Sequence, residues 1–192
     1  MPITKLEKEL EAVTLTITAE FNVPLRRLWD AYADPRQLEK FWGPPGWPAT
    51  FSRHDFAPGG LSNYYMTGPD GETSGGYWEF ISVDAPRTNE VRDGFALPDG
   101  TPNTEMPSMR MVFSFEAAGS GSKMTTTTYF NSAKDLEELL AMGMLEGTQA
   151  AMGQIDEVLA DLTSFAQGRG TEAQILSDTK VRISRIIRGD VE

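Results

Sequence analysis

The sequence predicts an α+β fold in which a curved antiparallel sheet wraps around a long C-terminal helix, with two short helices after the first strand. Residues 13–21 alternate apolar and polar side chains, as a half-buried strand does. Residues 50–130 contain further period-two runs separated by turn sequences, and residues 133–165 have helical spacing without proline. A sheet with one apolar face needs a cover, and only the last helix is long enough to provide it.

The first strand and the two short helices are indicated by alternation and by proline. In "VTLTITAEF" (13–21), apolar residues alternate with threonines. Pro24 then opens a first helix, because proline is favoured at early helical positions. Its apolar residues recur at helical spacing: Leu25, Leu28, Trp29 and Tyr32. A second short helix is expected from Asp34 to Phe41, ended by "WGPPGWP".

A meander of about six strands is expected between Thr50 and Phe130. The turn sequences "APGG", "GPDG", "DAPRTN", "LPDG" and "GSGS" separate its runs. Alternation is clearest in "SMRMVFSFE" and "KMTTTTYF". It places on one face Met109, Met111, Phe113 and Phe115 of the first run, and Met124, Thr126, Thr128 and Phe130 of the second.

A stripe of small residues marks the long helix. Gly143, Gly147 and Ala151 follow one another at i, i+4 spacing and therefore share one face. Glycine inside a helix costs about 1 kcal/mol relative to alanine, so the two glycines need a reason. Either the helix packs closely on the sheet, or missing side chains leave a cavity between them. Methionines, which adapt to irregular space, flank the stripe at Met142, Met144 and Met152.

Composition excludes several classes of function. The chain has 192 residues and a formal net charge of −11, so nucleic acid and anionic membrane surfaces are poor partners. It has no cysteine, which excludes disulfides, thiol catalysis and thiolate metal sites. The N-terminal residues lack a signal-peptide pattern, and no apolar run approaches the ~20 residues of a membrane helix. A cytoplasmic protein is expected.

Three collinear motifs resemble a known family. "LWDAYADPRQLEKFWGP" is similar to the helical segment of the activator of heat-shock-protein-90 ATPase homologue-1-like family, and "DFAPGGLSNYYMTGPDG" to its hairpin. "GMLEGTQAAMGQIDEVLADL" resembles its final helix. The resemblance implies the helix-grip fold of the START, or SRPBCC, superfamily, whose members hold hydrophobic ligands between sheet and helix. It assigns residues 13–165 to one such ligand-binding domain.

No catalytic or metal-binding set emerges from the sequence. His54 and Asp55 are adjacent on an expected strand and point to opposite faces, so a surface or core histidine is favoured over a general base. Four carboxylates scatter around the long helix without a histidine partner, which favours a solvated face: Asp135, Glu137, Glu138 and Glu146. We therefore expect no cofactor, no metal and no enzyme activity.

Strand parity and the family resemblance give a candidate cavity lining. The expected ligand-binding residues are Tyr64, Met66, Trp78, Phe80, Met111, Phe113, Thr126, Thr128, Met144, Gly147 and Ala151. Aromatic walls with a few hydroxyls are typical of a small-molecule pocket, although the same residues would also fill a core. Trp29, Trp42 and Trp47 are expected to serve the hinge and lid packing of the two short helices.

These residues predict non-enzymatic binding of a small hydrophobic or aromatic molecule. Two alternatives remain open. One is a protein-interaction role, such as a co-chaperone in the stress response that stimulates a chaperone ATPase. The other is a cyclase- or hydrolase-like enzyme of the same fold, which needs an ionisable pair inside the cavity.

The C-terminal tail, residues 166–192, resembles the beginning of a second, truncated repeat. After a glycine-rich linker, "VRISRIIRGDVE" matches the first strand shifted by 166 positions, with Ile183 at the place of Ile17. A strand at residues 179–188 is expected to add to its own sheet or to that of another subunit. Exchange between subunits, giving a symmetric homodimer, is favoured. The alternative is a solvated tail.

Overall fold

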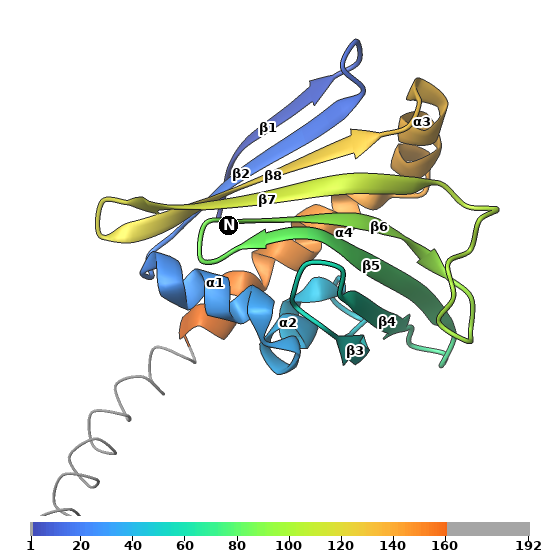
Figure 1. Cartoon of the computed structure of the whole chain (residues 1–192), viewed down its shortest axis with the longest axis horizontal. Coiled ribbons are helices and arrows are strands. Elements are labelled where there is room, and N and C mark those ends of the chain that lie inside the picture. Colours follow the sequence, from blue (N-terminus) through green and yellow to red (C-terminus); the bar gives the residue numbers. More distant parts are fainter. Residues whose placement is uncertain (1, 161–192) are drawn as a thin grey trace, which may run out of the picture. The chain divides into compact units, whose positions relative to one another are not determined.

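The computed structural model describes residues 2–160, in which one compact unit runs to Val158. Its centre is a curved eight-stranded sheet with the order β1-β2-β8-β7-β6-β5-β4-β3 (Figure 1). All neighbouring strands pair antiparallel. The strands are β1 (Ile3–Glu9), β2 (Thr14–Phe21), β3 (Ala49–His54), β4 (Leu61–Thr67), β5 (Thr73–Asp84), β6 (Thr88–Ala96), β7 (Ser108–Ala118) and β8 (Gly121–Phe130).

Helices cover one side of this sheet. They are α1 (Leu25–Ala33), α2 (Pro35–Trp42), α3 (Ala133–Ala141) and α4 (Met144–Gly153). Figure 1 shows α1, α2 and α4 together on this side, with α3 at the end of β8. The predicted helix-grip fold is confirmed, including the two short helices and the meander of six strands from β3 to β8.

The edge strand β1 was not expected from the sequence. It pairs with β2 and extends the sheet to Ile3, before residue 13, where the domain was predicted to begin. Except for Ile3, its residues are exposed. Because neither face of the strand is buried, its sequence does not alternate between apolar and polar residues. A strand without alternation gives no period-two signal, and its place is set by backbone pairing with β2.

The predicted long helix is interrupted after α3. Gly143 has a φ of 83°, a left-handed conformation that glycine adopts without the steric cost of a Cβ atom. The chain therefore turns between α3 and α4. A second interruption, at Gln154, is one residue long and keeps a right-handed helical backbone, and helix resumes at residues 155–160. Residues 161–165 of the predicted helix and the expected linker and strand at 166–192 lie outside the described residues. The subunit exchange predicted from them stays a prediction.

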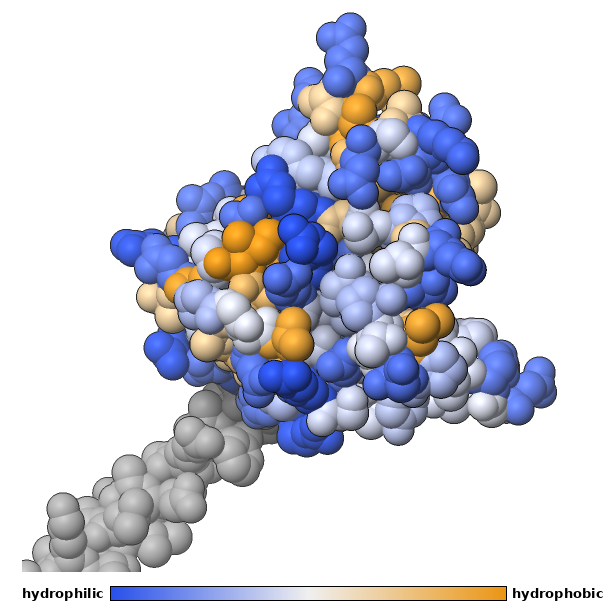
Figure 2. All heavy atoms as spheres, turned by 45° about the vertical axis from the view of Figure 1, so that its right-hand side comes forward, coloured by the Kyte–Doolittle hydropathy of each residue, from blue (hydrophilic) through white to orange (hydrophobic). Residues whose placement is uncertain are grey.

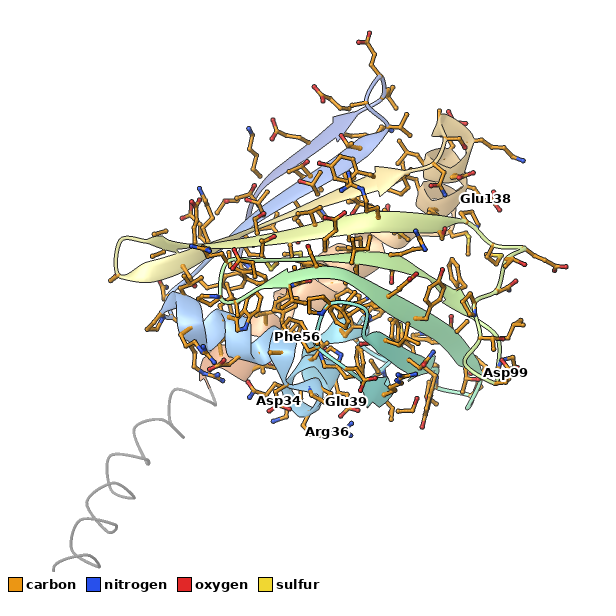
Figure 3. All side chains as sticks on the ribbon, viewed as in Figure 1. Asp34, Arg36, Glu39, Phe56, Asp99 and Glu138 are labelled. Atoms are coloured by element: carbon orange, nitrogen blue, oxygen red, sulfur yellow. The ribbon has the colours of Figure 1, made fainter. Side chains whose placement is uncertain are left out.

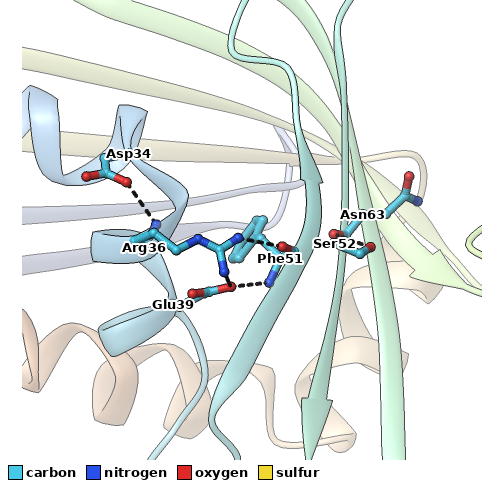
Figure 4. A network of polar contacts seen from close by, with 6 residues as sticks. All are labelled: Asp34, Arg36, Glu39, Phe51, Ser52 and Asn63. Carbon is cyan, nitrogen blue, oxygen red and sulfur yellow. Dashed lines mark hydrogen bonds and ion pairs between the residues drawn. The ribbon is translucent and has the colours of Figure 1, made fainter.

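A network of polar contacts fixes α2 to the edge strand β3 (Figure 4). The Asp34 carboxylate caps α2 by accepting a hydrogen bond from the Arg36 backbone N–H at 2.9 Å. The Arg36 guanidinium donates to the Phe51 carbonyl at 2.8 Å, and Glu39 Oε1 accepts from the Phe51 N–H at 2.7 Å. Arg36 and Glu39 also pair at 3.0 Å. The network satisfies backbone groups that an edge strand would otherwise leave open, and it holds α2 in place.

Candidate functional site

A cavity of about 460 Å³ lies between the sheet and the helices. Strands β2 and β4 to β8, the α2 region and the α3–α4 segment all contribute side chains to its wall. Its volume falls within the range of small-molecule binding sites. Gln154 Nε2 donates to the Gly43 carbonyl at 2.7 Å, which ties the C-terminal end of α4 to the turn after α2.

Most of the predicted site residues meet around this cavity. The structure places nine of the eleven in its wall: Tyr64, Met66, Met111, Phe113, Thr126, Thr128, Met144, Gly147 and Ala151. Trp42 and Trp47, expected only to pack within the short-helix region, also line it. The Thr126 and Thr128 hydroxyls form no hydrogen bond within residues 2–160, so their oxygens are open to a ligand. That these residues contact a ligand stays a prediction.

Trp78 and Phe80 are the two predicted residues that lie outside the cavity wall. Each is only 1% exposed. The Trp78 ring packs edge-on against Trp42, with centroids 4.5 Å apart, and Phe80 packs against Phe56 at 5.0 Å. Figure 3 labels Phe56, which lies between β3 and β4. The alternation of side chains along β5 correctly predicted that both rings point toward the helices. At this end of the sheet, however, the cover is α2 and the β3–β4 connection, which fill the space above the rings.

The two alternatives for the glycine stripe are distinguished by the space around it. A Cβ atom built on Gly143 or on Gly147 would meet no atom within 4 Å outside its own helix and chain neighbours. Both residues line the cavity, as does Ala151. The two glycines therefore leave room between helix and sheet, and they do not serve close packing.

One acidic residue in the cavity wall, Asp93 on β6, was not expected from the sequence. The residue is 8% exposed. Oδ1 accepts a hydrogen bond from the Trp78 indole N–H at 2.7 Å and a long one from the Tyr64 hydroxyl at 3.5 Å. Burial raises the pKa of Asp93 to about 7, and the two hydrogen bonds oppose that rise. The group therefore changes charge near neutral pH.

Register explains how these three side chains meet. Asp93 pairs directly with Trp78 across β5 and β6, so both project from the same face. Tyr64 lies opposite Gly76, and a Cβ atom on Gly76 would overlap the Tyr64 ring. Glycine at this position lets the ring lie over β5 and reach Asp93.

A signal for Asp93 was present in the sequence. In "TNEVRDGFA", Asn89, Val91 and Asp93 share one parity, and all three are buried. With Val91 taken as inward-facing, Asp93 follows two residues later on the same face. The run is short and lies between two turn sequences, so its alternation was not recognised.

His54 has a structural role. Its Nε2–H donates to the Tyr32 carbonyl at 3.2 Å, which leaves Nδ1 to accept from the Ser62 hydroxyl at 2.7 Å. Burial lowers the pKa of His54, so the ring is neutral at pH 7. Asp55 pairs instead with Arg53 at 2.6 Å. The His54 ring thus bonds to Tyr32 and Ser62 and not to Asp55, in agreement with strand parity.

Residues 2–160 contain neither a metal-binding cluster nor a membrane-spanning helix. No group of three or more His, Cys, Asp or Glu side chains there is placed to hold a metal ion. None of the helices in this range is both long enough and apolar enough to cross a membrane.

Solved structures similar to this chain share its fold. Protein Ms6760 from Mycobacterium smegmatis is 48% identical, with a TM-score of 0.77 over 82% of this chain and 97% of its own. A protein from Arthrobacter aurescens is 41% identical, with a TM-score of 0.79 over 82% and 92%. One from Staphylococcus epidermidis is 25% identical, with a TM-score of 0.73 over 82% and 94%. No curated protein matches the chain.

A family model provides the assignment. The model described as "Activator of Hsp90 ATPase homolog 1-like protein" matches residues 22–160, which is most of the chain. This range contains the helical segment, the hairpin and most of the final-helix motif that suggested the family from the sequence. The chain belongs to the family of activator of Hsp90 ATPase homolog 1-like proteins.

Proposed function

We propose that this protein binds a small hydrophobic or aromatic molecule in the cavity between the sheet and α4, and that it does not transform it. The observation that carries the proposal is the space left by the glycine stripe, around which a wall of about 460 Å³ is built. A cavity of this size that is lined by a glycine inside α4, Gly147, has a cost in helix stability, which ligand binding explains.

The chemistry of the wall supports an apolar ligand. Aromatic rings such as Trp42 and Phe113 provide flat apolar surface, and methionines such as Met111 adapt to different shapes. A few polar groups, among them Thr126 and Thr128, would fix the orientation of the ligand.

A cyclase- or hydrolase-like activity is the second candidate, and the position of Asp93 favours it. Asp93 and Tyr64 form an ionisable pair in the cavity wall, which such an enzyme requires. Burial raises the pKa of Tyr64 well above its ordinary value, so this hydroxyl stays protonated. The wall lacks a histidine within the described residues, and the carboxylate has no activated nucleophile beside it. Binding without turnover accounts for the wall with fewer assumptions.

A ligand screen by thermal shift tests the proposal. We would screen lipids, flavonoids and quinones against the whole chain, then measure affinities by calorimetry and recover each ligand for mass spectrometry. A ligand at a hundred times its Kd should stabilise the fold by about 2.7 kcal/mol and be recovered unchanged. The Gly147→Leu variant, which fills the open space, is the control and should lose the shift. A flat result in every class would contradict binding, and a changed ligand would establish an enzyme.

One face of the molecule lacks the features of a protein-docking site. Figure 2 shows a face that is mostly hydrophilic, with apolar residues in small separate groups. Docking sites usually present larger continuous apolar patches. The family description names activators of the Hsp90 ATPase, so the direct comparison is an ATPase assay with that chaperone. We expect no stimulation, and a rise in ATPase rate that survives in Gly147→Leu would instead support the co-chaperone role.

A further inference from the structure

The Asp93 carboxylate has one oxygen free to bind a ligand. Oδ1 holds the indole N–H of Trp78, but Oδ2 has no hydrogen-bond partner within residues 2–160. The residue is more than nine-tenths buried and forms part of the cavity wall. An acceptor oxygen in such a position is suited to a donor that enters the cavity.

The same carboxylate lacks a counter-charge. In the part of the chain that the structure describes, no lysine or arginine forms an ion pair with Asp93. Its neighbour Arg92 pairs instead with Glu79 at 2.8 Å, and both of these side chains are about half exposed. A buried carboxylate without a cation either takes up a proton or requires a charged partner.

Aromatic rings surround the place where such a partner would sit. Trp42 packs against Tyr64 with centroids 6.1 Å apart and against Trp78 at 4.5 Å, so it rests on both donors to Asp93. The indole nitrogen of Trp42 is buried and has no hydrogen-bond partner among the described residues. It approaches the Tyr64 hydroxyl and lowers the pKa of that group, against the larger effect of burial. Aromatic rings attract organic cations, and a net charge of −11 draws cations toward the protein.

We infer that the cavity selects hydrophobic organic amines, whose protonated nitrogen donates to Asp93 Oδ2 beside the rings of Trp42 and Tyr64. This inference rests on the proposed function and narrows its ligand class. The apolar part of the amine lies against the methionines and the open face of α4. A neutral molecule of the same shape leaves the carboxylate without a partner, and an anion is rejected.

Binding of an amine should depend on pH mainly through Asp93. The titratable group that faces it from β4 is Tyr64, while Tyr77 of β5 lies over Gly94 on the opposite face of the sheet; burial raises the pKa of both, so they stay neutral. The buried Tyr32 of α1 also stays neutral, since its pKa is raised too, and His54 is neutral above its lowered pKa. With Asp93 titrating near pH 7, affinity for an amine should fall by about thirtyfold from pH 8.5 to pH 5.5.

The experiment compares four naphthalene probes that differ only in the end of a short side chain. Naphthylethylamine carries a cation, naphthylethanol a neutral donor, ethylnaphthalene neither, and naphthylacetate an anion. Each is titrated by calorimetry into the whole chain and into two variants. Asp93→Asn removes the charge but keeps an acceptor for Trp78. Glu138→Gln removes one charge on α3, where Figure 3 shows the side chain directed outward.

We expect the unaltered protein and Glu138→Gln to bind naphthylethylamine at least tenfold more tightly than naphthylethanol at pH 8.5, and naphthylacetate most weakly. Asp93→Asn should bind the alcohol and the hydrocarbon as before but lose the preference for the amine. If the alcohol binds as tightly as the amine, or if Asp93→Asn keeps the preference, the inference is overturned while the proposed function stands. If no naphthalene probe and no compound of the screen binds, both fall. Should Asp93→Asn fail to fold, the pH series on the unaltered protein decides.

Discussion

The face of the sheet that the helices cover has two ends built from similar residues. One end is tightly packed, and the other borders the cavity. At the packed end, Trp78 and Phe80 lie beneath α2 and Phe56, and both are fully buried. At the open end, Met111 and Thr128 face α4 across a cavity of about 460 Å³. The sheet supplies inward-facing side chains at both ends.

The difference comes from the cover. Over the packed end, α2 and its neighbours contribute large aromatic rings that interlock with those of the sheet. Over the open end, the helical segment presents Gly143, Gly147 and Ala151, and nothing fills the space above the two glycines. The hydrogen bond from Gln154 to the Gly43 carbonyl fixes α4 to the turn after α2. The cavity is therefore a property of the helix and its attachments more than of the sheet.

The largest expected effect tests whether the two ends differ in packing. Phe80→Ala removes a fully buried ring and should lower the free energy of unfolding by about 3–5 kcal/mol. Phe95→Ala, at the cavity wall where the ring is only half-buried, should cost clearly less. Urea denaturation of both variants measures the contrast. Equal losses would show that the open end is as tightly packed as the other.

The next effect tests the charge at the boundary between the two ends. In the unfolded chain Asp93 titrates near 3.8, and in the folded protein near 7. Below pH 3.8 the group is protonated in both states and costs nothing. As pH rises to about 7, the unfolded state loses its proton first, so stability falls by up to about 4 kcal/mol.

Asp93→Asn should abolish that fall. Its free energy of unfolding relative to the unaltered protein should increase from pH 4.5 to pH 7 and stay constant above. Urea denaturation at several pH values provides the curve, without ligand. A difference that does not change with pH would mean that Asp93 is not buried as a titrating acid.

A smaller effect tests how the cover of the packed end is attached. Glu39→Ala removes the acceptor of the Phe51 N–H and the partner of Arg36, so it should cost about 1–2 kcal/mol. Glu79→Ala is the control, because it breaks only a half-exposed ion pair with Arg92 and should cost under about 1 kcal/mol. Thermal denaturation compares the two. A smaller loss in Glu39→Ala than in the control would show that α2 is held by other contacts.

The smallest effects separate the two glycines of the open end. Gly147→Ala adds a methyl group to open space inside α4 and should stabilise the fold by up to about 1 kcal/mol. Gly143→Ala forces a side chain into the left-handed region and should destabilise it by about 1 kcal/mol. Chemical denaturation gives both signs. If the two variants shift stability in the same direction, the turn at Gly143 is not what separates α3 from α4.

Much of the fold could be predicted because its signals are local. Threonine–apolar alternation identified β2 and β8, and Pro24 and Asp34 marked the starts of α1 and α2. The missed strand β1 has no such pattern, since pairing with β2 and not burial holds it. The break at Gly143 was also missed, because a glycine in a helical run is compatible with both a continuous and a turned backbone.

The sequence predicted which side chains point toward the helices, but not which of them border the cavity. Alternation placed Met111 and Thr126 on the cavity side, and it placed Trp78 and Phe80 there as well. Which of these side chains border the cavity depends on the distance between the sheet and the helices that cover it. That distance is set by contacts between residues far apart in sequence, such as the hydrogen bond from Gln154 to Gly43. Asp93 was missed because a charged residue in a short run between turns resembles a solvated one.

The two edges of the sheet have a consequence for the protein at high concentration. On β3, Arg36 and Glu39 occupy the Phe51 carbonyl and N–H that an incoming strand would use. On β1, charges of both signs alternate along the strand, with Lys5 paired to Glu7 at 2.7 Å. Strand-by-strand growth into fibrils requires flat, open and apolar edges. The described part of the chain presents neither edge in that form, so this sheet resists templated aggregation even though its interior holds an unfilled space.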